Sequence, residues 1–116
     1  MEGISILLIS SSPEIASLTQ CLQADCYAVA TFTETSTGLT QALSGAYKLV
    51  ILDLPLPTLS GLEALRQIRQ HSLIPVLILS DAPHETERIM ALELGADDYL
   101  PKPVALPEFT ARLRTI

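Results

Sequence analysis

The chain contains no tryptophan, and only 4% of its 116 residues are aromatic, so few rings could stack on a flavin or a base. It has two cysteines, Cys21 and Cys26, without metal-type partners, and we expect them to be free, reduced thiols. No apolar run is long enough to span a membrane, and no basic-then-apolar leader is present. These absences favour a soluble cytoplasmic protein.

Charged residues are also scarce, at 17%, and the net charge is -6. An acidic surface repels phosphates, which argues against direct binding of nucleic acid by this domain. Hydrophobic residues make up 48% of the chain, enough for a real core at this length. We therefore expect residues 1–116 to form one domain.

Apolar runs alternate with helical patterns five times along the chain, which predicts strands at 4–9, 27–32, 48–53, 75–80 and 97–100. The runs at 49–52 and 76–79 are apolar without a break, as expected for strands covered on both faces. Apolar residues at helical spacing mark five intervening helices: Ile15, Leu18 and Leu22; Leu39, Ala42 and Leu43; Leu62, Leu65 and Ile68; Ile89 and Leu92; Leu106, Phe109, Leu113 and Ile116. Repeated strand–helix units predict a doubly wound α/β fold with a five-stranded parallel sheet.

Polar side chains close three of the predicted strands: Asp53, Ser80 and the pair Lys102-Pro103. Since the carboxyl ends of parallel strands meet at one edge of a sheet, we expect these groups to lie together. A carboxylate nucleophile beside a hydroxyl and an ammonium group suits the formation and sensing of an acyl phosphate. The plainer alternatives are an exposed turn aspartate, a capping serine and a solvated lysine.

Four segments resemble a response-regulator receiver domain over essentially the whole chain: Ile6-Leu-Leu-Ile9, the run from Leu49 to Leu62, the run from Ile74 to Ser80, and Leu94-Gly-Ala-Asp-Asp-Tyr-Leu-Pro-Lys-Pro103. The C-terminal half is similar to the OmpR-type subgroup. The resemblance implies a flavodoxin-like sheet with strand order 2-1-3-4-5 and a signalling module rather than an enzyme. It also implies a C-terminal winged-helix DNA-binding domain, which this chain does not include.

The same resemblance assigns a role to each polar group. Asp53 is the expected phosphate acceptor, and Ser80 and Lys102 are the expected phosphate-sensing residues. Tyr99 matches the family's aromatic switch position, although an ordinary half-buried strand tyrosine would look the same. The Lys102-Pro103 bond is expected to be cis, since cis bonds are nearly confined to residues before proline.

Family members anchor magnesium with two acids directly after the first strand, where this chain has Ser10 and Ser11. Neutral hydroxyls add no charge to offset the dehydration of the ion, which prefers carboxylate ligands. Asp81 is a second departure, because a carboxylate after Ser80 narrows the entrance and repels a phosphate dianion. We expect no metal or other cofactor, with magnesium binding weak or absent.

Six charged residues match positions that OmpR-type receivers use across a two-fold dimer interface: Arg88, Glu93, Asp97, Glu108, Arg112 and Arg114. We expect Arg112 to face Asp97 of the second copy, and Ile89 and Leu92 to form an apolar patch at the same interface. A plainer reading remains for Glu108 and Arg112, which are four residues apart and could pair within one helix.

Three functions follow from these patterns. The first is an atypical receiver, a signalling and dimerisation module of a transcription regulator that works without magnesium-assisted phosphorylation. The second is a conventional receiver that accepts phosphate on Asp53, from a sensor kinase or another partner. The third is a flavodoxin-like enzyme or binder, in which Ser10-Ser11-Ser12 holds a phosphate at a helix N-terminus.

Overall fold

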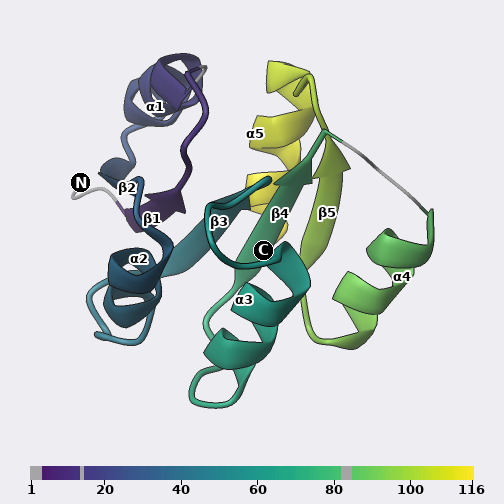
Figure 1. Cartoon of the computed structure of the whole chain (residues 1–116). Coiled ribbons are helices and arrows are strands. Elements are labelled where there is room, and N and C mark those ends of the chain that lie inside the picture. Colours follow the sequence, from purple (N-terminus) through teal and green to yellow (C-terminus); the bar gives the residue numbers. More distant parts are fainter. Residues whose placement is uncertain (1–3, 14, 82–84) are drawn as a thin grey trace.

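Five parallel strands form the sheet of the computed structural model, in the order β2-β1-β3-β4-β5 (Figure 1). The strands are β1 (Ser5–Ile9), β2 (Ala28–Phe32), β3 (Leu49–Asp53), β4 (Val76–Ser80) and β5 (Asp98–Pro101). The structure describes residues 4–13, 15–81 and 85–116. Every predicted strand is present, and each bound lies within one residue of the prediction. The predicted fold class and strand order are confirmed.

In the described residues, five helices alternate with the strands: α1 (Ile15–Ala24), α2 (Thr35–Ala42), α3 (Gly61–Arg69), α4 (Glu85–Glu93) and α5 (Leu106–Arg114). The two buried clusters show that α2, α3 and α4 cover one face of the sheet, while α1 and α5 cover the other. No helix in the described part of the chain is both long and apolar enough to cross a membrane.

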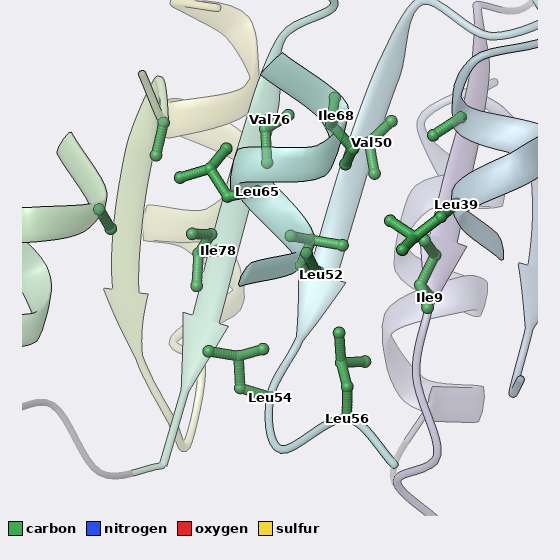
Figure 2. Close-up of a cluster of buried hydrophobic side chains, with 14 of the residues drawn as sticks. Ile9, Leu39, Val50, Leu52, Leu54, Leu56, Leu65, Ile68, Val76 and Ile78 are labelled. Carbon is green, nitrogen blue, oxygen red and sulfur yellow. The ribbon is translucent and has the colours of Figure 1, made fainter. Parts of the chain in front are cut away.

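The central strands supply side chains to both faces of the sheet, because successive residues of a strand point to opposite sides. On β3, Val50 and Leu52 join the cluster under α2, α3 and α4, whereas Leu49 and Ile51 join the cluster under α1 and α5. Figure 2 shows the first cluster, where Leu65 and Ile68 of α3 lie over β3 and β4. The unbroken apolar runs of the sequence are thus strands buried on both faces.

Several residues that mark helices in the sequence do not lie in the core. Leu43 follows α2 and is 41% exposed, and Ile89 and Leu92 on α4 are 45% and 36% exposed. Leu106 and Ile116 are also exposed, so Phe109 and Leu113 alone anchor α5. The small residue Ala91 is the only buried residue of α4, which leaves the larger side chains of that helix at the surface. Gly95 has φ +109° after α4, the left-handed conformation expected at a helix stop.

Candidate functional site

Asp53 is the last residue of β3, and its side chain is only 2% exposed. Both of its carboxylate oxygens are hydrogen-bonded. Lys102 Nζ lies 2.7 Å from Oδ1, and the Ser10 hydroxyl donates to Oδ2 at 2.6 Å. A buried carboxylate requires such partners, because burial without them disfavours the charged form strongly. The exposed-turn reading of Asp53 is therefore wrong.

Lys102 reaches Asp53 from the segment that follows β5, and its side chain is 14% exposed. Its ammonium group also donates to the backbone oxygen of Leu54, directly after Asp53. The backbone N–H of Lys102 donates to the oxygen of Ser80 at 2.7 Å, which ties this segment to β4. The Lys102-Pro103 bond is cis, the isomer that the family resemblance implies. Lys102 is thus a partly buried partner of Asp53 and not a solvated loop lysine.

The two serines that replace the expected acids occupy different environments. Ser10 is fully buried. Its hydroxyl oxygen accepts a hydrogen bond from the backbone N–H of Ser12 at 3.0 Å, and its hydroxyl group donates one to Asp53. Ser11 is exposed. Of these two serines, only Ser10 is therefore a hydrogen-bond partner of the Asp53 carboxylate.

Ser80 and Asp81 end β4 on the neighbouring side of the site. Ser80 is 3% exposed, whereas Asp81 is exposed. Asp81 borders a cavity of about 280 Å³ that is shared with Ser12, Pro13, Lys102 and Pro103. It also borders a second cavity of about 220 Å³ toward the segment after β3 and Glu87. The exposed Asp81 carboxylate thus borders the same cavity as Lys102.

The Tyr99 ring is turned inward and is 3% exposed. Its hydroxyl is buried, and no partner among the described residues meets it with good hydrogen-bond geometry. Burial raises the pKa of the Tyr99 phenol; the nearby Ser80 side chain acts the other way, and the Glu87 carboxylate raises the pKa further. The ring is therefore more deeply buried than the half-buried tyrosine of the plainer alternative, and its role as a switch stays a prediction.

The contacts around Asp53 do not resemble a magnesium site. In the described ranges there is no group of three or more His, Cys, Asp or Glu residues placed to hold a metal ion. Beside Asp53 the side-chain partners are a hydroxyl and an ammonium group, and neither adds a second carboxylate to hold a divalent cation. The residues present do not fit the octahedral, oxygen-rich site that magnesium requires.

The predicted interface residues lie on α4, β5 and α5 or next to them, and all of the charged ones are exposed. Several of these charges have partners within the chain. Arg112 lies 3.3 Å from Asp98 and 3.6 Å from Glu108, and Arg88 lies 3.4 Å from Glu85. These ion pairs do not cover the apolar residues of the surface, since Ile89 and Leu92 stay exposed.

Sequence reasoning missed two contributions to this region. Arg69, at the end of α3, is 14% exposed and pairs with Asp97, which we had expected to serve only the interface. The Leu54 backbone oxygen is a second acceptor for Lys102. An arginine at a helix C-terminus and a backbone carbonyl carry no sequence signal that could have revealed these contacts.

The comparisons with known proteins agree with this geometry. Residues 6–114 match the family model of the response regulator receiver domain, and the chain belongs to that family. It is 48% identical to the transcriptional regulatory protein QseB of Haemophilus influenzae over 91 residues, 78% of this chain and 41% of that protein. It is 36% identical to the response regulator ArlR of Staphylococcus haemolyticus over 113 residues, 97% of this chain and 52% of that protein. The chain therefore spans about half the length of these relatives.

One solved receiver structure that is similar to this chain contains magnesium. The receiver domain of the sensor histidine kinase PA1611 from Pseudomonas aeruginosa is described with a magnesium ion coordinated in its active site cleft. This chain is similar to it with a TM-score of 0.86 and 26% identity, over 97% of this chain and 96% of that one.

The family match removes the flavodoxin-like enzyme or binder as an alternative.

Proposed function

We propose that this chain is the receiver module of a two-component transcription regulator and that Asp53 accepts the phosphoryl group. The observation that carries this is the buried Asp53–Lys102 pair, at 2.7 Å, at the carboxyl edge of a receiver fold. The sequence alone led us to rank phosphorylation-independent signalling first. Family membership and the retained Asp53 favour the conventional alternative, so the order of the two is reversed.

The chemistry assigned to the site is a phosphoryl transfer. A carboxylate oxygen of Asp53 attacks the phosphorus of a phosphohistidine or a small acyl phosphate, and the bond to the leaving group breaks. The leaving group keeps the electron pair, while Asp53 becomes an acyl phosphate. A carboxylate leaves as its anion, whereas the histidine imidazole is protonated by a solvent acid as it leaves. Lys102 then balances the charge of the phosphoryl oxygens and Ser80 donates a hydrogen bond to one of them, which is mostly electrostatic stabilisation.

Incubation with acetyl phosphate tests this directly. Intact-mass spectra should show one added phosphoryl group in the wild type and none in Asp53→Asn, which keeps the size of the side chain but removes the nucleophile. Hydroxylamine should remove the adduct, because it cleaves acyl phosphates. An unmodified wild type, both with acetyl phosphate and with a phosphorylated sensor kinase, would contradict the proposal.

Phosphorylation-independent signalling is the second candidate, and one observation favours it. The charge on Asp53 is already balanced by Lys102 and Ser10 in the resting protein, so nothing in the site is left incomplete without phosphate. In that case a full-length regulator that carries Asp53→Asn would give the same output as the wild type. A lower output in Asp53→Asn, with the fold intact, would reject this candidate.

The output of the module is proposed to run through dimerisation and DNA binding. The relatives are named as regulators, and about half of their length lies outside the match. We assign that remainder to a C-terminal winged-helix domain, which would carry the DNA contacts, since the net charge of -6 disfavours them here. The α4–β5–α5 surface would form the two-fold interface, with exposed Ile89, Met90 and Leu92 in its apolar part.

A further inference from the structure

Two side chains, Ser10 and Lys102, hold the Asp53 carboxylate in this chain, which lacks the acids that anchor magnesium in the family. Ser10 and Lys102 each bind a different oxygen of Asp53, so each carboxylate oxygen already has a side-chain donor. Lys102 places a positive charge 2.7 Å from Oδ1. An ammonium group at that distance supplies the charge compensation that a metal ion gives in a carboxylate cluster.

Ser10 is held in place by the backbone. The Ser12 N–H donates to the Ser10 hydroxyl oxygen at 3.0 Å, which leaves the hydroxyl proton directed at Asp53 Oδ2, 2.6 Å away. The Ser10 hydroxyl thus links the backbone N–H of Ser12 to the carboxylate of Asp53 through two hydrogen bonds. Ser10 is fully buried, so water does not compete for either contact.

We propose that this receiver has a metal-free acceptor site, in which Lys102 supplies the positive charge beside Asp53 and Ser10, in place of a ligating acid, is a positioning residue that holds Oδ2 of Asp53. Phosphorylation of Asp53, on which this inference rests through the proposed function, then proceeds equally with and without magnesium. The chain's own ammonium group neutralises the charge that develops on the phosphoryl oxygens. The nucleophile, leaving group and products are those of the transfer described above.

Metal binding can be measured without any reaction. Manganese(II) broadens NMR signals of nearby nuclei, so a titration reports a divalent site directly. The amide signals of Ser10, Asp53 and Lys102 should broaden no more than those of exposed acidic surfaces such as Glu108. Selective broadening at Asp53 that is saturable and lost in Asp53→Asn would overturn the proposal.

The thermal stability of Ser10→Asp also tests whether the site of the wild type is metal-free. A second buried carboxylate beside Asp53 would leave two negative charges for one lysine, so Tm should fall in EDTA and recover on addition of magnesium. The wild type and Gln23→Glu, which adds one negative charge at an exposed site on α1, should show no magnesium-dependent Tm. A wild-type Tm that rises with magnesium as much as that of Ser10→Asp would overturn the proposal.

The acetyl phosphate reaction completes the test, run once with magnesium and once with EDTA. Equal rates of phosphorylation support a metal-free acceptor site. A reaction that needs magnesium, together with selective manganese broadening, overturns the metal-free site but leaves Asp53 as the acceptor. No phosphorylation under either condition, together with no metal binding, overturns the proposed function while the metal-free arrangement of Asp53 stands. The two failures are therefore distinguishable.

Discussion

Arg69 donates a hydrogen bond to Oδ1 of Asp97 at 3.2 Å, and the same oxygen accepts the backbone N–H of Val76 at 2.9 Å. This contact joins the end of α3 to the loop before β5 and the first residue of β4. It also means that Asp97 has a structural role within the chain. Our expectation that Arg112 faces Asp97 of a second copy has to compete with this contact, because Arg112 itself lies beside Asp98.

The first prediction concerns the stability that Arg69 provides. Its guanidinium also donates to the backbone oxygens of Gly95 and Ile74, at 2.8 and 2.7 Å. Arg69→Met keeps the apolar stem but leaves these carbonyls unpaired, so we expect a loss of about 2–4 kcal/mol in the free energy of unfolding. Arg66→Met is the matched control: Arg66 is 58% exposed and pairs only with Glu63, so its loss should cost about 0.5 kcal/mol or less. Urea denaturation measures both, and equal effects would contradict this role.

The sheet could be predicted from the sequence because its signal is local. Unbroken apolar runs at 49–52 and 76–79 are explained by burial on two faces, and polar residues at the strand ends converge because parallel strands share one edge. The helix faces were less predictable. Ile89 and Leu92 have helical spacing but point to solvent, because Ala91 is the residue that faces the core.

The site was predictable in its members and not in its contacts. Asp53, Ser80 and Lys102 follow from strand ends, but nothing in a run of three serines tells which hydroxyl meets a carboxylate. That choice depends on the backbone path after β1, which buries Ser10 and exposes Ser11. The same holds for Arg69, whose acceptors are backbone carbonyls from distant segments.

The second prediction separates the Asp53–Lys102 pair into its parts. Lys102→Met leaves Asp53 with only the Ser10 hydroxyl, and an uncompensated buried charge costs about 3–5 kcal/mol. Adding Asp53→Asn to Lys102→Met should recover much of this loss, because the charge that needed compensation is gone. Chemical denaturation of the wild type, both single variants and the double variant gives the coupling energy. Strictly additive effects would show that the 2.7 Å contact does not contribute to stability.

The third prediction is that a magnesium site can be restored. Ser10→Glu with Ser11→Asp places two acids beside Asp53 and should recover part of the metal binding, measured by calorimetry. Adding Asp81→Ala removes a carboxylate that borders the cavity next to Lys102, so the triple variant should be phosphorylated faster than the double variant, because an anionic phosphodonor is repelled less. If the triple variant binds no magnesium, these three positions are not the whole reason for the poor fit.

The fourth prediction concerns alkaline pH. Burial raises the pKa of the Tyr99 phenol in the folded protein above its unfolded value of about 10. The stability that comes from this shift is fully present below the unfolded pKa and is lost as pH rises through the folded pKa. Tyr99→Phe should therefore lose less stability than the wild type between neutral and strongly alkaline pH. Tyr27→Phe, which removes a half-buried phenol elsewhere, is the control. Parallel pH profiles of wild type and Tyr99→Phe would contradict the assignment.

The fifth prediction tests the dimer surface through its apolar part. Ile89 is 45% exposed on α4, beside Met90 at 46%, and a two-fold contact there would remove both from water. Ile89→Glu should weaken self-association measured by sedimentation, because a buried carboxylate without a partner opposes burial. Leu73→Glu is the matched control, since Leu73 is 90% exposed in the loop after α3, outside this surface.

Charge reversal on the same surface gives an independent check of that dimer. Arg112→Glu should also weaken it, by reversing a charge beside Asp98 and Glu108. Asp97→Arg would restore only part of the association, because this change also breaks the contact with Arg69. A wild type that remains a monomer at high concentration, or a dimer that tolerates Ile89→Glu as well as Leu73→Glu, would show that this surface is not the interface.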